Sequence, residues 1–349
     1  MASIRKRSLN GEARWDVTVT RRGAPRQTRT FRTKATAERW ARETERDIER
    51  GAWRSTAMAE RTTLAQLLER YHDEVAPTKK SANDLKGRLN RLRDFDIARL
   101  NLIAVSPERL VQFRKSRLRA RVRLGGPRGK TLRPIATQTV RHELKLIGTV
   151  IKHAMREWGL ELPAGDPLRN VKLPPQGRPR DRRTQGDEYE RILSEARASK
   201  SPKLAPAIEL AVETSMRRGE ICNLVWGDID LDRRVARCRE TKNGEPRNVA
   251  LSRRAVEVLK SLPRHDGDEN DAVIGVKPSS FTQAFKRICE RLKLENIRLH
   301  DLRHEAASRL AEKLNGDVIA LSTMTGHKTL SMLKRYTHLR AEDVAKRLD

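Results

Sequence analysis

A stretch rich in proline and arginine, at residues 174–183, divides this chain of 349 residues and limits what it can fold into. It reads Pro-Pro-Gln-Gly-Arg-Pro-Arg-Asp-Arg-Arg, and proline keeps such a segment extended, so no helix or sheet is expected to continue through it. The residues on each side must therefore bury cores of their own, and the chain is long enough for two or three domains that do so. We predict a linker at residues 174–186.

The first 57 residues are predicted to form a small basic domain, a three-stranded sheet with one helix. The sequence pattern locates two of the strands, at 13–20 and 27–32, joined by a turn at 21–25, and a helix at 36–50 with a stop at Gly51. Residues 1 to 34 carry ten Lys and Arg against only Glu12 and Asp16. A disordered basic arm is the alternative, but Trp15, Phe31 and Trp40 have a core-like spacing that such arms rarely show.

Residues 61–173 are predicted to be helical throughout. Thr63 and Gln66 have the spacing of a capping box, which opens a helix that runs through Tyr71. Apolar residues repeat at helical spacing at positions 85, 89 and 92, and again at 144, 147, 150 and 151. With two strands expected at 235–238 and 248–251, the predicted fold class is α+β and mostly helical, with a mixed α/β domain at residues 187–349.

The net charge of +29 and the pI near 10.9 call for a polyanionic partner, with nucleic acid as the leading candidate and an anionic membrane as a distant second. Between Arg109 and Arg133 there are ten Lys and Arg and no acidic residue. A charge run is often only a solvated face, but one sign throughout a folded segment favours contact with a phosphate backbone. The candidate DNA contacts are Arg5, Lys6, Arg7, Arg21, Arg22, Arg114, Lys115, Arg117, Arg119, Arg121, Arg123, Arg178, Arg180, Arg182 and Arg183.

Nothing in the sequence indicates a membrane, a disulfide framework or a metal. No apolar run approaches the roughly 20 residues of a membrane span, and residues 1–7 lack the apolar stretch of a signal peptide. Cys222, Cys238 and Cys289 have no metal-ligand spacing and are read as reduced structural thiols. Such thiols are expected in a cytosolic protein.

The residue types of a phosphodiester-cleaving site are concentrated in the last third of the chain. Thr-Ser-Met-Arg-Arg-Gly-Glu at 214–220 supplies Arg217 and Glu220, and His-Asp-Leu-Arg at 300–303 supplies His300 and Arg303. Arginines hold phosphate oxygens, a hydroxyl attacks and histidines assist. Each motif alone also has a purely structural interpretation. An Arg-Arg-Gly-Glu turn is usually a surface salt bridge, and a lone histidine on such a helix is more often structural. His304, at i+4 from His300, flanks the same helix face, and spacing alone does not exclude it.

Two further residues complete this set. Lys242 precedes Asn243-Gly244, the expected turn of a hairpin between the two strands, and would be a plain exposed lysine if taken in isolation. Tyr336 follows His327 by nine residues and is one of only three tyrosines in the chain. A core aromatic on an amphipathic helix is the alternative interpretation of Tyr336. The set is informative because its members occur together and in order.

These stretches resemble the tyrosine recombinase, or phage integrase, family. The matching segments are Thr-Ser-Met-Arg-Arg-Gly-Glu, Thr-Lys-Asn-Gly-Glu-Pro-Arg, His-Asp-Leu-Arg-His-Glu-Ala and Thr-Gly-His…Lys-Arg-Tyr-Thr-His, from about residue 180 to the end. The stretch 332–339 is also similar to that of shufflon-type DNA invertases. One departure is Ser215, where the family usually has glycine, and it bears on the geometry of that turn.

The resemblance implies a role for each residue. Tyr336 would be the nucleophile, and Arg217 and Arg303 would clamp the scissile phosphate. His300 and His327 would assist proton transfer and phosphate binding, Lys242 would protonate the leaving 5′ oxygen, and Glu220 would orient the site. The implied product is a 3′-phosphotyrosyl bond, formed without ATP, metal or other cofactor. The basic N-terminal domain and a helical core-binding domain at 61–173 would grip the DNA.

The implied function is site-specific recombination by a prophage or mobile element, with integrase or excisionase activity. The location that this implies is the bacterial cytoplasm, on the nucleoid. A homotetramer would act on two specific recombination sites in double-stranded DNA, with an accessory DNA-bending or directionality factor as a further partner. A shufflon-type invertase is the alternative within the family, and a type IB topoisomerase-like enzyme is a more distant one. A purely DNA-binding regulator would not need the catalytic set, and a metal-dependent nuclease or transposase would need clustered carboxylates.

Overall fold

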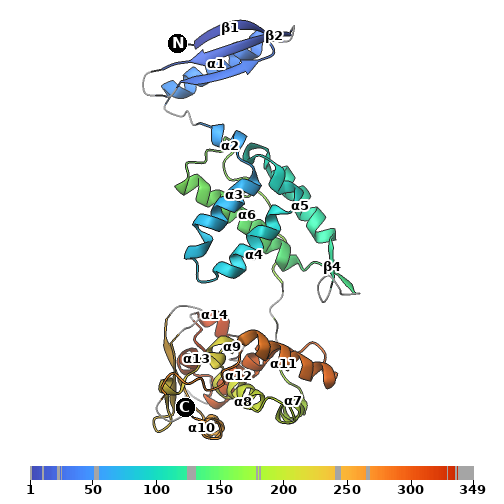
Figure 1. Ribbon diagram of the computed structural model, residues 1–349, viewed down its shortest axis with the longest axis vertical. Helices are drawn as coiled ribbons and strands as arrows, with labels where there is room; N and C mark the ends of the chain where they lie inside the picture. Colours follow the sequence, from blue (N-terminus) through green and yellow to red (C-terminus); the bar gives the residue numbers. More distant parts are fainter. Residues whose placement is uncertain are drawn as a thin grey trace, which may run out of the picture. The chain divides into compact units, whose positions relative to one another are not determined.

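The computed structural model divides the chain into two compact units, Met1–Arg178 and Pro179–Asp349 (Figure 1). The residues that it describes are 2–9, 12–21, 24, 26–50, 55–123, 131–177, 180, 182–239, 245–264, 268–327, 329–334 and 336. Most of them are helical, and the chain has the mostly helical α+β fold that the sequence predicts. Among the described helices, none is both long and apolar enough to cross a lipid bilayer.

An antiparallel sheet with one helix packed on it opens the first unit. Its elements are β1 (Ala2–Leu9), β2 (Glu12–Val19), β3 (Gln27–Phe31) and α1 (Lys34–Glu49). The strands are adjacent in chain order, and Val17 and Val19 of β2 are buried against Ala37 and Ala41 of α1. The predicted sheet with one helix is therefore confirmed, whereas the predicted stop at Gly51 lies outside the described residues.

The rest of this unit is a helical bundle. It contains α2 (Ala57–Arg61), α3 (Leu64–Glu74), η1 (Ala76–Thr78), α4 (Ala82–Arg93), η2 (Asp96–Arg99), η3 (Leu102–Ala104), α5 (Pro107–Arg119) and α6 (Thr137–Glu157). The predicted capping box is present, because Thr63 Oγ1 accepts from the Gln66 amide and Gln66 Oε1 accepts from the Thr63 amide. The predicted apolar face of α6, including Leu144, Ile147 and Ile151, is fully buried in the bundle core.

One part of the prediction for this region is wrong. Between α5 and α6 the chain forms two antiparallel strands, β4 (Arg121–Arg123) and β5 (Leu132–Pro134), so residues 61–173 are not helical throughout. The physical reason is visible in the sequence, where Gly125, Gly126 and Pro127 interrupt any helical periodicity and favour a turn. The run of basic residues indicates the charge of this segment but not its secondary structure.

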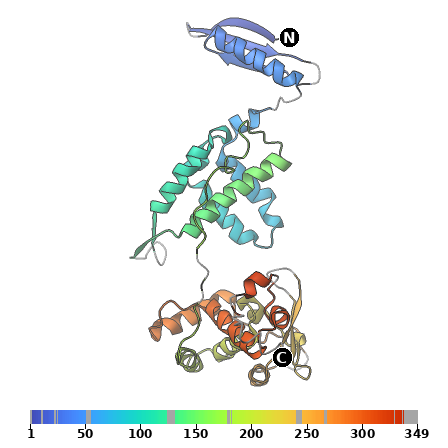
Figure 2. The ribbon, with the colours of Figure 1, turned by 180° about the vertical axis from the view of Figure 1, so that it is seen from behind.

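The second unit packs its helices around α8. Its elements are α7 (Glu188–Arg197), α8 (Leu204–Thr214), α9 (Arg218–Cys222), η5 (Trp226–Asp228), β6 (Ile229–Asp230), β7 (Val235–Cys238), β8 (Arg247–Ala250), α10 (Arg253–Lys260), α11 (Pro278–Arg291), α12 (Leu299–Lys313), α13 (Val318–Thr325) and α14 (Leu330–Leu333). Nearly every residue of α8 is buried, and α7, α10 and α12 pack on it. Figure 2 shows this cluster of helices from the opposite side.

The small sheet of the second unit has the strand order β6-β7-β8 and is antiparallel. It confirms the two strands predicted there, while the predicted turn at Asn243-Gly244 lies outside the described residues. Cys222, Cys238 and Cys289 are buried free thiols in this unit. Burial raises the pKa of each thiol to about 11, so they remain protonated, as expected for structural residues.

Three arginines of the predicted linker are attached to the second unit. Arg180 pairs with Asp301 and Arg183 with Glu305, both on α12, and Arg182 pairs with Glu188 on α7. The Asp301 and Glu305 side chains are only 3% and 5% exposed. The described residues at 180 and 182–186 therefore belong to the second unit.

Candidate active site

A cleft of about 760 Å³ in the second unit collects the predicted catalytic side chains. Arg217, His300, Arg303, His327 and Tyr336 all line it, although they come from separate parts of the chain. Glu220 lies beside Arg217 but does not line the cleft. Lys242 lies outside the described residues. The structure therefore brings together five of the seven predicted catalytic residues in the cleft and a sixth behind it.

The first arginine is positioned by an unusual turn at the end of α8. Ser215 follows the helix with φ 53° and ψ 21°, the left-handed conformation that glycine adopts most readily. This explains why the family usually has glycine at this position. Serine adopts the same turn here, and its backbone carbonyl faces Arg303 and accepts a hydrogen bond from Arg303 Nη1.

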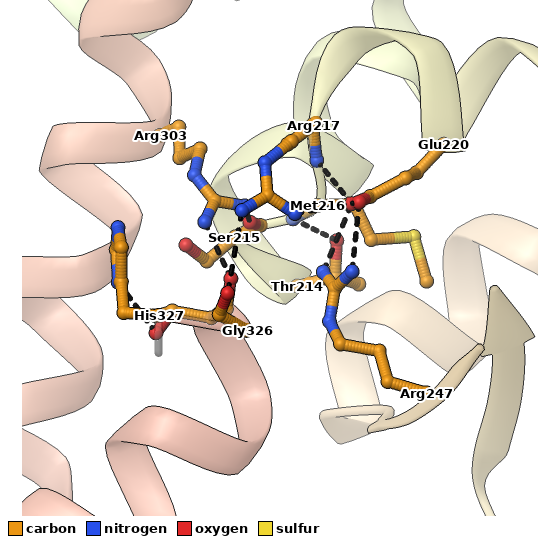
Figure 3. A network of polar contacts seen from close by, with 10 residues as sticks. Thr214, Ser215, Met216, Arg217, Glu220, Arg247, Arg303, Gly326 and His327 are labelled. Atoms are coloured by element: carbon orange, nitrogen blue, oxygen red, sulfur yellow. Dashed lines mark hydrogen bonds and ion pairs between the residues drawn. The ribbon is translucent and has the colours of Figure 1, made fainter. Parts of the chain in front are cut away.

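Arg217 is held by a carboxylate that it shares with a second arginine (Figure 3). Glu220 Oε1 accepts from Arg217 Nη1 at 2.8 Å, and Glu220 Oε2 accepts from the Arg217 backbone amide at 2.7 Å. From the opposite side, Arg247 of β8 donates to the two oxygens of Glu220 at 2.7 and 2.9 Å. The Glu220 side chain is only 3% exposed. One buried carboxylate therefore sets the position of two guanidinium groups.

The charge of Glu220 is stabilised by these partners. Burial by itself would raise the pKa of this carboxyl. Hydrogen bonds from Arg247 and from the Arg217 amide and guanidinium, together with the positive charge of Arg247, outweigh burial and lower the pKa to about 2. Glu220 is therefore ionised at neutral pH. Its role is to position the two arginines, and a carboxylate that stays ionised does not exchange protons during the reaction.

Arg303 is buried at the base of the cleft, with 4% of the residue exposed. Its guanidinium donates to the backbone carbonyls of Ser215 and Thr325, which orient it without neutralising it. Burial and then the charge of Arg217 lower its pKa to about 10, so Arg303 still carries its charge at neutral pH. A fixed cation with little access to water interacts strongly with an anion that enters the cleft.

The tyrosine hydroxyl contacts a histidine that was not among the predicted catalytic residues. The distance from His304 Nδ1 to Tyr336 Oη is 2.5 Å, and the two rings are tilted by 30°. Tyr336 itself is buried against Ala307, Ala311, Leu321 and Leu333. The tyrosine is thus both a packed aromatic and a residue of the cleft, so the two interpretations left by the sequence are compatible.

His300 lies one turn before His304 on α12, with the ring centroids 5.1 Å apart. It is exposed at the cleft, yet partial desolvation, followed by the nearby His304 and Arg303, lowers the pKa of His300 to about 4. Its imidazole is therefore neutral near pH 7.

His327 follows the C-terminus of α13, where Gly326 takes a φ of 65°. A Cβ at Gly326 would meet Arg247 Cδ at 2.9 Å, so this close approach requires glycine. His327 Nδ1 lies 2.8 Å from Thr325 Oγ1, and its ring centroid is 6.2 Å from that of Tyr336. The turn therefore presents one imidazole beside the tyrosine and packs its backbone on Arg247.

The predicted DNA contacts differ in whether a partner within the protein already binds them. Arg5, Lys6 and Arg7 on β1, Lys115 and Arg119 on α5, and Arg121 and Arg123 on β4 are exposed. Five others have carboxylate partners within their own unit: Arg21 with Glu49, Arg117 with Glu143, Arg180 with Asp301, Arg182 with Glu188, and Arg183 with Glu305. Arg114 donates to the Lys172 carbonyl, and Arg22 and Arg178 lie outside the described residues.

Sequence reasoning therefore missed two residues of the site, His304 and Arg247. His304 was recognised on the correct helix face, but only its contact with Tyr336 distinguishes it from His300. Arg247 is the last residue of the matching stretch Thr-Lys-Asn-Gly-Glu-Pro-Arg. Its place in that stretch is the feature of the sequence that could have identified Arg247 as a residue of the site. Its pairing with Glu220 joins residues 27 apart in the chain, which no local periodicity predicts.

Comparison with known proteins agrees with this architecture. The profile of the Phage integrase family matches residues 182–343. A shufflon-specific DNA recombinase of Escherichia coli is 36% identical over 287 residues, covering 82% of this chain and 72% of that protein. A putative integrase/recombinase of Haemophilus influenzae is 30% identical over 305 residues, covering 85% and 92%.

Among solved structures, a lambda integrase dimer bound to a COC′ core site has the same fold. It superposes with a TM-score of 0.60 at 20% identity, covering 95% of this chain and 94% of that one. The fold and the relatives together define the class of the protein as a tyrosine recombinase. The chain belongs to the phage integrase family: it is a tyrosine-type site-specific DNA recombinase, an enzyme that breaks and rejoins DNA strands.

Proposed function

We propose that the chain recombines DNA through a covalent 3′-phosphotyrosyl intermediate formed on Tyr336. One observation carries this assignment: the Tyr336 hydroxyl lies in the same cleft as Arg217 and Arg303 and contacts the His304 imidazole. A free tyrosine has a pKa near 10, so at neutral pH it needs a proton acceptor and nearby positive charge to attack. The cleft offers both.

In this mechanism Arg217 and Arg303 bind the non-bridging oxygens of the scissile phosphate. The Tyr336 hydroxyl gives its proton to His304 Nδ1 as its oxygen forms a bond to phosphorus. The bond from phosphorus to the 5′ oxygen then breaks, and that oxygen needs a proton to leave. Lys242 is the proposed donor, with His327 and His300 as alternatives. His300 is the weaker of these two, because its lowered pKa leaves the imidazole unprotonated near pH 7. Because one phosphoester replaces another, attack by a 5′ hydroxyl reverses the steps and joins the strands without ATP.

Glu220 and Arg247 act behind this cleft as positioning residues. Their pairing fixes Arg217, whose Nη2 also donates to the Gly326 carbonyl at 3.3 Å. Arg303 is fixed by the Ser215 and Thr325 carbonyls. Preorganised cations of this kind stabilise the charge that develops on the phosphorane without having to reorganise.

Replacing Tyr336 with Phe tests the assignment, because it removes only the attacking oxygen. The variant is expected to bind DNA but to form no covalent adduct on a nicked suicide substrate, as read on denaturing gels. An adduct that persists in the variant would assign the nucleophile to another residue. Relaxation of plasmids that carry no recombination site would instead support a type IB topoisomerase activity.

Integration and excision by a mobile element is the reaction we propose, carried out by a tetramer on two DNA sites. The integrases among the relatives support it, as does a lambda integrase tetramer solved on a Holliday junction, which has this fold with a TM-score of 0.59. Inversion is the second candidate, favoured by the 36% identity to a shufflon recombinase. Paired sites placed in direct orientation, in inverted orientation and on separate plasmids distinguish the two: an integrase joins separate molecules, whereas an invertase acts on inverted pairs.

A further inference from the structure

The β4–β5 ribbon is a surface feature that the packing of the bundle does not explain. Its two strands pair Arg121 with Pro134, Val122 with Arg133, and Arg123 with Leu132. All six residues are exposed, with Val122 at 39% and Leu132 at 50%. The residues that flank the ribbon, Ala120 and Ile135, already pack on the bundle core. The ribbon itself extends away from the helices (Figures 1 and 2).

A two-stranded ribbon this short gains little stability on its own, so its exposed sequence calls for another explanation. Directly paired residues lie on the same face of a ribbon, which places Arg121, Arg123 and Leu132 on one face and Val122 with Arg133 on the other. Each face therefore combines an arginine with an exposed aliphatic side chain.

Two arginines of the ribbon differ from the arginine of the helix that precedes it in whether a carboxylate neutralises them. Within the described part of the unit, Arg121 and Arg133 have no carboxylate partner, and the nearest acidic residues in the sequence are Glu108 and Glu143. By contrast, Arg117 on the preceding helix forms a two-pronged ion pair with Glu143 at 2.7 and 2.9 Å. The bundle thus uses Arg117 for its own stability, whereas Arg121 and Arg133 keep their charge for a partner.

We propose that the β4–β5 ribbon enters the major groove of duplex DNA and reads base edges there. The proposal rests on the activity on DNA described above. The major groove is about 12 Å wide and admits a two-stranded ribbon, where arginine pairs with guanine and aliphatic groups contact thymine methyls. A surface that only followed phosphates would need the arginines but would gain nothing from exposed Val122 and Leu132.

The test is a selection from random-sequence duplexes by the full-length protein and its variants. The ribbon variants are Val122→Ser with Leu132→Ser, and Arg121→Ala with Arg133→Ala. The matched controls lie in the same unit: Arg99→Ala, whose side chain is 81% exposed, and Ile103→Ser, which is 42% exposed. Thermal unfolding establishes that each variant folds, which is expected because no substituted residue belongs to the bundle core.

We expect both ribbon variants to lose sequence preference at a few contiguous base pairs while the controls keep the whole motif. At those positions, replacing thymine with uracil or guanine with 7-deazaguanine is expected to weaken DNA binding by the wild type about tenfold. The same replacements should leave the DNA affinity of the ribbon variants unchanged. The arginine variant should also lower the slope of log K against log salt if its guanidiniums bind phosphates, by about 0.9 for each phosphate that is no longer neutralised.

Two results would overturn the proposal. A motif that the ribbon variants retain in full would show that the ribbon does not read bases, as would an affinity loss that is equal for all sequences. A wild-type motif that is insensitive to both base analogues would exclude the major groove. Because these measurements score binding, they are independent of adduct formation by Tyr336, and failure of one assignment is distinguishable from failure of the other.

Discussion

The contact between His304 and Tyr336 assigns the first proton transfer of the proposed reaction to a single side chain. Replacing His304 with Ala is expected to slow adduct formation by about 10²- to 10⁴-fold, the usual effect of losing a proton acceptor. DNA affinity should stay near that of the wild type. Single-turnover cleavage of a suicide substrate measures both quantities.

Fluorinated tyrosine at position 336 supplies the control, since its hydroxyl ionises at lower pH. If His304 accepts the proton, this substitution should restore most of the rate to the His304→Ala variant. If the His304→Ala variant forms the adduct equally slowly with tyrosine and with fluorinated tyrosine at position 336, His304 only packs against the ring.

Glu220 predicts a pH dependence of stability whose sign follows from its lowered pKa. The native carboxyl has a pKa of about 2, against 4.5 for the free group. Its contribution, roughly 3 kcal/mol, is therefore complete above pH 4.5 and is lost as the pH falls toward 2. The difference in unfolding free energy between the wild type and Glu220→Gln should shrink over that range. Urea denaturation at a series of pH values measures it, and a difference independent of pH would contradict the assignment.

Helix α12 shows how one element links the site to the segment that precedes the catalytic unit. It carries His300, Arg303 and His304 toward the cleft, while Asp301 and Glu305 on the same helix pair with Arg180 and Arg183. The sequence suggested that these arginines contact DNA. Their ion pairs offer a different role, which is to hold the catalytic helix in place.

The two roles predict different outcomes for Arg180→Ala and Arg183→Ala. As anchors of α12, each arginine should cost about 2 kcal/mol of stability when removed, because a buried carboxylate loses a partner. Cleavage of bound DNA should also slow. Arg182→Ala is the matched control, since Arg182 pairs with Glu188 on α7. Loss of DNA affinity with unchanged stability would favour DNA contact instead.

For the molecule as a whole, the division of labour between units can be tested by truncation. The N-terminal sheet has its own small core around Val17 and Val19 and contributes no residue to the cleft. Its exposed strand β1 carries Arg5, Lys6 and Arg7. Removing residues 1–56, just before α2 begins, should weaken or redirect DNA recognition and leave adduct formation on a nicked suicide site intact. If the truncated protein folds but no longer cleaves, the sheet takes part in catalysis.

The sequence by itself determined the family, the mostly helical fold and the ordered set of candidate catalytic residues. Those features are carried by local patterns: apolar periodicity, the capping box at Thr63, and short motifs whose spacing is set by single helices and turns. The same motif order led to Arg217, Arg303 and Tyr336, which the structure gathers in one cleft.

Tertiary structure alone decided between side chains that local spacing leaves equivalent. His300 and His304 are one helical turn apart, and only the packing of Tyr336 against α12 selects His304 for the hydroxyl contact. Arg247 of β8 pairs with Glu220 of α9 across 27 residues of sequence, and Arg180 pairs with Asp301 across 121 residues. A guanidinium paired with a carboxylate and one free for a phosphate look the same in sequence, because the partner is chosen by the fold.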